Sequence, residues 1–346
     1  MAYTTIDDPS AYFQVKTYTG TGSSLALTFD GNSDLQPDLV WVKSRTNAYS
    51  HYIYDSTRGV QKRLLTDTDA AESTLAQGLT AFGSNGMTFG TDAGANESSD
   101  AHVAWGWKAN GGTTSSNSTG DITTTVQANT TAGFSIMTWT SNNADNQTLG
   151  HGLGAAPEVF WVKLRSAQGS WYCYHKEAGA THYISLNSNG AKVDNVIWGD
   201  TAPTSSVITV DTNSVSGSTP TALTYAWKEI QGFSKFGGYT GNGNTDGAFV
   251  YLGFKPALII VRATDTDNWR MYDHKRANAY NVIDVRIIAD TNAAESQDDN
   301  ECDFLSNGVK WRSSSGGVNS SGQEYIYMAF AEHPFVSSEG VPTTAR

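Results

Sequence analysis

The sequence predicts an all-β fold of three tandem antiparallel β-sandwich units with a jelly-roll-like architecture. One phrase recurs three times along the chain, and short β-branched and aromatic runs alternate with Gly- and Asn-rich turns. No stretch has the Ala, Leu, Glu and Lys content that is typical of a long helix. Many short strands at this spacing, in a chain with internal repeats, are typical of tandem sandwiches or jelly rolls.

The recurring phrase defines the three units. It reads Pro-Asp-Leu-Val-Trp-Val-Lys-Ser-Arg at residues 37–45 and returns at residues 157–165 and, in shorter form, at residues 256–262. Each copy follows a phenylalanine and precedes a tyrosine phrase and then an alanine–aromatic pair. The phenylalanines are Phe13, Phe134 and Phe233. The tyrosine phrases are residues 52–55, 172–175 and 271–273, and the alanine–aromatic pairs are residues 104–105, 226–227 and 329–330. A period of roughly 100 residues suits one small domain.

The repeats predict the domain organisation. The units are expected at residues 11–108, 133–231 and 232–335, with a polar tail at residues 336–346. Residues 109–132 are rich in Gly, Thr, Ser and Asn, which is the composition of a linker.

Within this linker, the β-branched residues 122–126 favour an edge strand. No linker separates the second and third units, so we expect these two to pack rigidly and the first unit to move more freely. The second unit is the divergent copy, because it lacks the Ala-Glu-Ser phrase found at residues 71–73 and 294–296.

The local patterns predict how individual strands are buried. Residues 39–42, 159–162 and 258–261 are continuous apolar runs, which suit strands buried on both faces, so Trp41 and Trp161 are expected in the core. Residues 52–54 and 325–327 are expected to be half-buried strands. The Asn-Gly pairs at 85–86 and 307–308 predict tight hairpins with two positive-φ residues.

Composition excludes several classes of function. The net charge is −12, from 22 basic and 34 acidic residues, and an acidic surface repels nucleic acid. No stretch approaches 18 apolar residues, so no membrane span is expected, and the N-terminal residues do not resemble a signal peptide. The two cysteines, Cys173 and Cys302, occupy non-equivalent positions and are expected to be free, partly buried thiols.

No pattern in the sequence indicates catalysis or a cofactor. The seven histidines lack zinc-ligand spacing, and the Gly-rich residues 150–154 precede a strand rather than a helix, unlike a phosphate loop. The acidic residues 265–268 and 298–303 could bind calcium, but solvated loops are the favoured interpretation. A pair of carboxylates for glycoside hydrolysis needs only spatial proximity, so that alternative stays open.

Aromatic residues are the main candidates for binding. Tyr49, Trp171, Trp198 and Trp269 are expected in or near loops, where an exposed ring can stack on a sugar or anchor a protein interface. The loop at residues 92–100 is longer than a tight turn requires, and we expect any recognition surface around Tyr49, residues 92–100 and residues 265–269, with a tolerated surface insertion as the alternative.

Charged residues also recur between the units. Arg45 with Asp55, and Arg262 with Asp273, are expected to form one structural ion pair per unit, with a shared anion or sugar site as the alternative.

Four segments resemble a known family. Residues 37–43, 239–243, 303–310 and 325–335 are similar to the uncharacterised repeat domain of virion proteins from tailed bacteriophages. The resemblance implies a structural role as a fibre, spike or capsid decoration, and it implies no catalytic residues. There is no heptad-patterned stalk, which favours a short protein that docks directly on the particle.

These observations together predict a non-enzymatic virion protein on the particle surface. Its expected partners are capsid or tail proteins, a host surface glycan and further copies of itself, without nucleic acid or membrane insertion. The alternative function is a carbohydrate-binding module that recognises a receptor.

Overall fold

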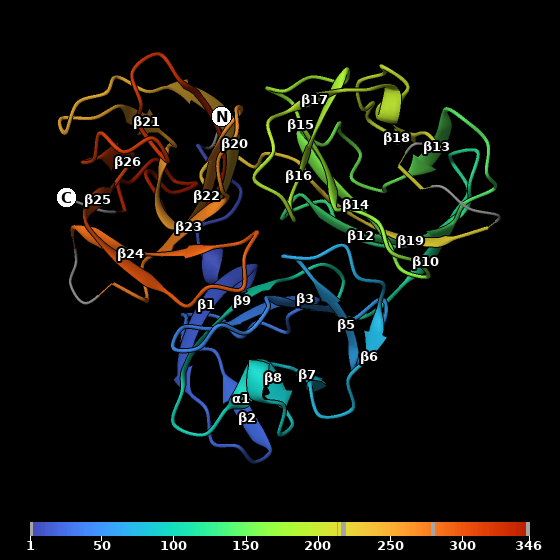
Figure 1. Ribbon diagram of the computed structural model, residues 1–346, viewed down its shortest axis with the longest axis horizontal. Coiled ribbons are helices and arrows are strands. Elements are labelled where there is room, and N and C mark those ends of the chain that lie inside the picture. Colours follow the sequence, from blue (N-terminus) through green and yellow to red (C-terminus); the bar gives the residue numbers. More distant parts are fainter. Residues whose placement is uncertain (1–2, 213, 216–218, 278–280, 344–346) are drawn as a thin grey trace.

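The computed structural model describes residues 3–212, 214–215, 219–277 and 281–343, without the side chains of residues 298–300 (Figure 1). Within this part, the regular structure consists of antiparallel β-sheets together with short helical turns, so the predicted all-β, sandwich-like fold class is confirmed. The turns are η1 (Pro9–Ala11), α1 (Ala93–Asn96) and η2 (Val196–Trp198).

The first large sheet is covered on one face by a smaller sheet. Its strands, in spatial order, are β1 (Phe13–Thr19), β9 (Ala101–Trp107), β3 (Leu39–Ser44), β4 (Tyr52–Asp55), β5 (Lys62–Leu65) and β6 (Ser73–Thr74). The covering sheet contains β2 (Leu25–Thr28), β8 (Gly86–Phe89) and β7 (Leu79–Gly83). The apolar side chains between the two layers include Val40, Val42, Met87 and Phe89.

The second large sheet has a similar arrangement. Its order is β10 (Ser115–Asn117), β11 (Thr124–Asn129), β12 (Phe134–Thr140), β19 (Thr221–Trp227), β14 (Val159–Leu164), β15 (Tyr172–His175), β16 (His182–Ser185) and β17 (Val193–Asp194). The pair β13 (Gln147–Gly150) and β18 (Val207–Val210) covers one face.

The third large sheet continues into its own covering layer. Its order is β20 (Ser234–Thr240), β27 (Glu324–Pro334), β22 (Phe254–Ala263), β23 (Arg270–Asp273), β24 (Ile283–Ile288), β25 (Ser296–Leu305), β26 (Gly308–Trp311) and β21 (Phe249–Tyr251). The strand β21 therefore forms one edge of this sheet.

One four-strand arrangement occurs in each large sheet. The orders β1-β9-β3-β4, β12-β19-β14-β15 and β20-β27-β22-β23 match, and the register places Leu39 opposite Trp107, Val159 opposite Trp227 and Leu258 opposite Phe330. The recurring sequence phrase thus forms the third strand of each arrangement. The residue boundaries given above for the three units stay a prediction.

The apolar runs on these strands are buried on both faces, as predicted. Every residue of β3 and β14 is buried. Successive side chains point to opposite faces of a strand. In β3, Trp41 therefore contacts one apolar cluster, while Val40 and Val42 contact another.

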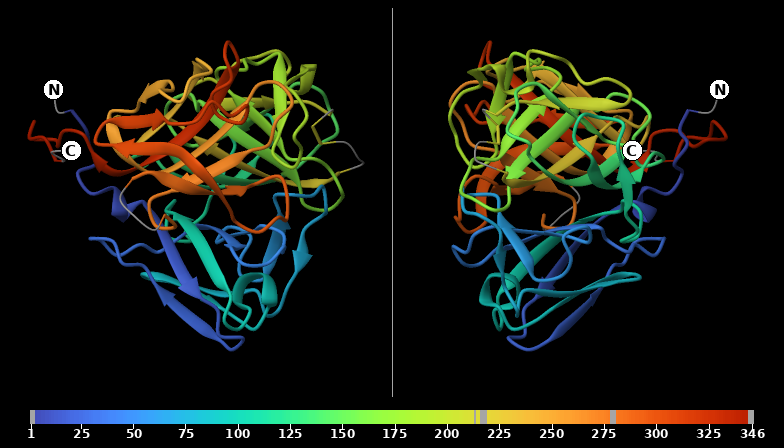
Figure 2. Two further views of the ribbon diagram at one scale, coloured as in Figure 1. Left: turned by 60° about the vertical axis from the view of Figure 1, so that its left-hand side comes forward. Right: turned by 90° about the vertical axis from the view of Figure 1, so that its right-hand side faces the viewer.

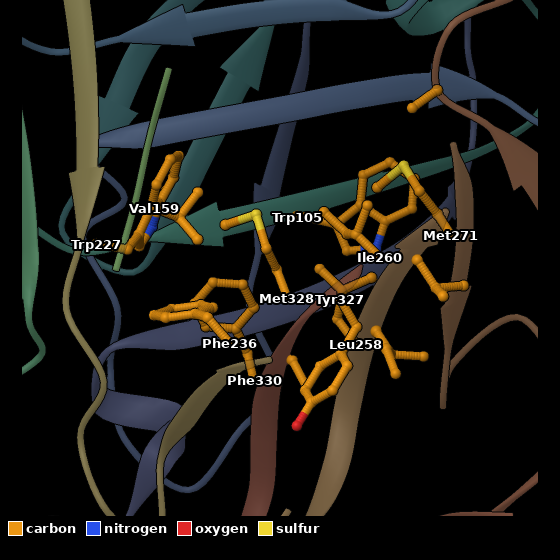
Figure 3. Packing of buried hydrophobic residues seen from close by; sticks show 14 of the residues in the cluster. Trp105, Val159, Trp227, Phe236, Leu258, Ile260, Met271, Tyr327, Met328 and Phe330 are labelled. Carbon is orange, nitrogen blue, oxygen red and sulfur yellow. The ribbon is translucent and has the colours of Figure 1, made fainter. Parts of the chain in front are cut away.

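The three large sheets share one aromatic core (Figure 3). Trp41 of the first sheet meets Trp161 of the second edge to face, with ring centroids 5.9 Å apart, and Phe13 stacks on Phe330 of the third at 5.2 Å. Trp105, Trp227 and Phe330 point toward this common region from different sheets. Figure 1 accordingly shows three lobes around a shared centre.

The segment predicted as a linker is part of this assembly. Residues 109–132 supply β10 and β11, and β11 pairs along β12, so it is not the edge strand. The Gln127 side chain donates to the hydroxyls of Ser56 and Thr57 at 2.9 and 2.7 Å, and Asp38 accepts from the Gly111 amide. These contacts, with the shared core, contradict the expectation that the first unit moves freely.

Two further local expectations are wrong. Residues 52–54 and 325–327 are buried rather than half-buried, because layers cover both faces of these strands. The hairpins do occur at the Asn-Gly pairs, but the loops are Ser-Asn and the glycine begins the next strand. A Cβ on Gly86 or Gly308 would lie 2.0 or 2.2 Å from a carbonyl oxygen of the neighbouring strand, so close strand approach requires glycine there.

We predict that Trp41→Ala destabilises the whole assembly. The ring is completely buried where two sheets meet, and truncating a buried tryptophan costs about 3–5 kcal/mol. Chemical denaturation should show this loss. Val60→Ala is the control, because Val60 is 39% exposed. Equal stability of the two variants would contradict the shared core.

Candidate functional site

Charged side chains at the boundary between the first and second sheets form a buried network. The Arg58 guanidinium binds the Asp55 carboxylate, and both side chains are fully buried. Glu72 bridges Arg58, at 3.1 Å, to Arg165 of the second sheet, at 2.9 Å. The Tyr225 hydroxyl of the second sheet donates to Asp55 at 2.7 Å. The network therefore joins the two sheets.

The boundary between the third and first sheets repeats this network. Arg276 binds Asp273 at 2.6 Å and Glu295 at 2.9 Å, and Glu295 binds Arg45 of the first sheet at 2.7 Å. The Trp105 indole nitrogen of the first sheet donates to Asp273 at 3.0 Å.

The predicted ion pairs Arg45–Asp55 and Arg262–Asp273 are therefore wrong. Each aspartate binds the arginine three residues later along the chain, and Arg45 reaches a different sheet. Arg262 instead donates to carbonyl oxygens of the second sheet, including those of Ser185 and Ser188 at 3.2 and 3.1 Å.

Hydrogen bonds to backbone carbonyls replace the network where the second and third sheets meet. His175 occupies the position of the two aspartates on its strand. Its Nδ1 accepts from the Glu177 amide at 3.2 Å, so its Nε2 carries the proton and donates to the Tyr327 carbonyl at 3.1 Å. Burial lowers the pKa of His175 to about 4. The imidazole is therefore neutral at pH 7.

Three of the four predicted binding aromatics are buried. The Trp171 indole donates to the Leu65 carbonyl of the first sheet at 2.7 Å, and the Trp269 indole donates to the Ser185 carbonyl of the second at 2.9 Å. Trp198 packs on Phe160 at 4.6 Å inside the second sheet's core. These rings cannot stack on a ligand, so the expectation of exposed loop aromatics is wrong for all three.

Tyr49 lies partly exposed beside the loop at residues 92–100. Its hydroxyl donates to Glu97 at 3.1 Å. The loop itself is anchored, because the buried Asn96 donates to the Gly90 carbonyl at 2.7 Å and accepts from the Thr21 amide at 2.8 Å. Tyr49 and this loop therefore form one surface region, and these hydrogen bonds hold the loop backbone in place.

Described members of both acidic clusters bind arginine side chains, and the side chains of residues 298–300 in the second cluster lie outside the described part of the structure. Asp267 binds Arg270 at 2.7 Å, and Asp303 binds Arg312 at 2.6 Å. In the part of the chain that the structure describes, no group of three or more His, Cys, Asp or Glu residues is placed to hold a metal ion.

Cys173 and Cys302 are buried thiols without a disulfide, and burial raises the pKa of each. Across the described residues, no helix has the length and apolar character needed to cross a membrane.

A polar pocket of about 170 Å³ opens between β1 and the third sheet. Its Gln14 and Asp8 side chains are held by bonds to their own loop. Asp30 at its rim pairs with both Lys16 and Lys275 at 3.1 Å. The His274 ring contacts the Ala257 carbonyl at 3.1 Å, and burial lowers its pKa. Most of the charge in this pocket is therefore neutralised internally.

The exposed aromatic strip on β21 is the stronger candidate. Phe249 and Tyr251 are 45% and 48% exposed, although Val250 between them is buried. The Lys235 ammonium lies 5.2 Å from the centre of the Tyr251 ring. The Tyr3 hydroxyl lies 3.3 Å from the Tyr251 hydroxyl and donates to the Gly253 carbonyl at 2.9 Å. We call Tyr3, Lys235, Phe249 and Tyr251 the β21 strip.

Sequence analysis missed the β21 strip. Phe249 and Tyr251 alternate with an apolar residue, as they would in a buried strand, and they directly follow a turn-rich segment. Large exposed aromatic side chains next to one another are unusual on a monomer surface and mark interaction sites. The alternation of residues was the one sequence feature that could have indicated the strip, because it places both aromatic rings on the same face of the strand.

Comparison with known protein families finds a match over most of the chain. The family described as "Domain of unknown function (DUF7483)" matches residues 8–334. A comparison with curated proteins found no match.

We predict that Glu72→Gln lowers the free energy of unfolding by about 3 kcal/mol, because it leaves Arg58 with one carboxylate partner fewer in a buried site. Asp30→Asn is the matched control. Asp30 also binds two cations but is 50% exposed, and surface pairs contribute about 1 kcal/mol or less. Similar losses from both substitutions would contradict the structural role of the buried network.

We also predict that stability falls as the pH decreases from about 6.5 to 4. His175 stays neutral in the folded protein, while the unfolded chain binds a proton near the ordinary pKa of about 6.5. The stabilisation is complete above that pH and is lost on approach to pH 4, at about 3 kcal/mol for this group.

The measurement is urea unfolding at several pH values for the wild type and His175→Asn. Their difference in stability should shrink as the pH decreases. His333→Asn is the control, since that side chain is 40% exposed. A difference between wild type and His175→Asn that is independent of pH would refute the assignment.

Proposed function

The chain belongs to the DUF7483 family, and we propose that it is a non-enzymatic structural protein on the outside of a bacteriophage particle. In this proposal it serves as a capsid decoration, a head fibre or a short tail-attached fibre. Its task is to dock on the particle and to adhere to the host surface.

The first support is the resemblance of four sequence segments to the repeat domain of phage virion proteins. Two of these segments have structural roles here. Residues 37–43 include most of β3, and residues 325–335 include most of β27, and both strands contribute to the shared core. A protein that displays surfaces on a particle needs such a rigid scaffold more than it needs a cleft.

The observation that carries the proposal is the placement of the aromatic and charged groups. Trp171, Trp269, Arg58 and Arg276 are all used to join the large sheets. The β21 strip is instead available at the outer rim of the third sheet, labelled at the upper left in Figure 1. A rigid body with an exposed aromatic strip fits a docking role.

The test compares particle incorporation of the wild type with that of the double variant Phe249→Ser and Tyr251→Ser. Purified particles are analysed for copies of the chain by quantitative mass spectrometry. We expect at least a tenfold loss of copies for the double variant. The control is Val193→Ser with Val196→Ser, which removes another exposed apolar pair, 40% and 49% exposed, from the second sheet's region. Absence of the wild-type chain from purified particles would refute the proposal.

A second function, carbohydrate binding, is favoured by the same strip. Exposed Tyr and Phe rings stack on the apolar faces of sugars, and Lys235 adds a hydrogen-bond donor next to Tyr251. A glycan array distinguishes the two functions. Binding of the wild type and its loss in Tyr251→Ser would support sugar recognition by the strip, and an array without signal would favour protein docking.

A further inference from the structure

We propose that β21 pairs antiparallel with β21 of a second copy of this chain, so that two third sheets become one continuous sheet. This inference rests on the proposed function, because it names the partner of the β21 strip. It concerns the contact between copies and not the contact with the rest of the particle.

One side of the β21 backbone pairs with no strand of the described chain. Leu252 donates its amide to Asn307 at 2.9 Å, and Ala248 accepts from the Trp311 amide at 3.0 Å, so the even-numbered residues face β26. The backbone groups of Phe249 and Tyr251 therefore point away from the sheet. The Tyr251 carbonyl accepts from the Lys235 ammonium at 3.0 Å, so a second strand would have to displace this side chain.

The spacing of these groups fits pairing with an identical strand. An antiparallel pair centred on Val250 places Phe249 of each copy opposite Tyr251 of the other. Both are then hydrogen-bonded pairs, because the outward-facing residues on each strand exchange amide and carbonyl bonds. A twofold axis makes the two halves of such an interface identical.

Side chains on this edge match in the same arrangement. Both aromatic rings lie on one face of β21, so pairing brings each Phe249 against the partner strand's tyrosine, and aromatic cross-strand pairs stabilise sheets. Lys235 lies at the Tyr251 end of the strand, while Asp246, whose side chain is 80% exposed and pairs with Lys310 at 2.7 Å, lies beyond the Phe249 end. Antiparallel pairing therefore places Lys235 of each copy near the Lys310–Asp246 pair of the other.

Three other sheet edges are less suitable. The edges near β6 and β17 are covered, because Glu72 donates its amide to Arg165 and Lys192 donates to Thr264 of the neighbouring sheets. On β20, the Glu229 carboxylate already accepts from the Phe236 amide at 2.8 Å. An exposed edge strand with large apolar side chains is a ready site for another strand.

The first test measures association of the purified full chain by sedimentation velocity at concentrations from micromolar to hundreds of micromolar. We expect a dimer that the double variant Phe249→Lys with Tyr251→Lys weakens at least tenfold, because four lysines would then meet at one edge. Val196→Lys, on a different exposed surface, is the control and should associate like the wild type. A wild-type chain that stays monomeric throughout this range would overturn the inference.

The second test reports the register. In the proposed pair, Phe249 and the partner strand's tyrosine are a hydrogen-bonded pair with Cα atoms about 5.5 Å apart, within the range of a disulfide. A mixture of the single variants Phe249→Cys and Tyr251→Cys should therefore oxidise to a crosslinked dimer several times faster than either variant alone. The native Cys173 and Cys302 are buried and do not compete. Equal rates in all three samples would overturn the proposed pairing.

The two proposals can fail separately. A dimer with the expected crosslink, in a chain that is absent from particles, would leave the pairing intact and refute the particle role. A monomeric chain that is lost from particles when the strip is changed would leave docking intact and refute the second copy as partner.

Discussion

Burial of charge between sheets is the constraint on which the rest of the structure depends. The Arg58 and Arg276 side chains are completely buried, and each needs carboxylates that are themselves bound by the next sheet. Asp55 also takes a hydrogen bond from Tyr225, and Asp273 takes one from Trp105. Because removing one partner of a buried ion pair costs about 3–5 kcal/mol, a single large sheet separated from its neighbours would leave these groups unsatisfied. The three sheets are therefore stable together, around the shared tryptophan core.

The divergence of the middle copy follows from the same constraint. Arg45, Arg165 and Thr264 hold equivalent positions, since each donates its amide to the strand that corresponds to β9. Where the third sheet has Thr264 instead of arginine, the second sheet presents Lys192 instead of glutamate and His175 instead of aspartate. Keeping any one charged member of the network at this boundary would leave it without a partner. These three positions differ together, which explains why the second copy lacks the Ala-Glu-Ser phrase.

Much of the fold could be predicted from the sequence, and the site could not. The apolar runs at residues 39–42 and 159–162 place Trp41 and Trp161 in the core because a run without polar residues has no face for water. The same reasoning failed for Trp171 and Trp269, whose loop-like flanks conceal a contact with another sheet. It failed again for Arg45 and for residues 109–132. The partners of a charged residue or a polar segment can lie on another sheet, and the local sequence does not indicate which sheet that is. Local sequence patterns predict how a strand is buried, whereas contacts between sheets determine which partners its polar residues bind.

The contrast between two similar strands shows why the β21 strip was missed. Tyr52-Ile53-Tyr54 and Phe249-Val250-Tyr251 share one pattern, in which an apolar β-branched residue separates two aromatic rings. In β4, the small sheet β2-β8-β7 covers the rings and both tyrosines are buried. In β21, the buried valine faces the core while no layer of the described chain covers the rings. Period-two alternation identifies which residues share a face, but only the stacking order of layers determines whether that face meets solvent. In a strand at the edge of a covering layer, residues with the sequence pattern of a core strand can therefore form an exposed binding surface.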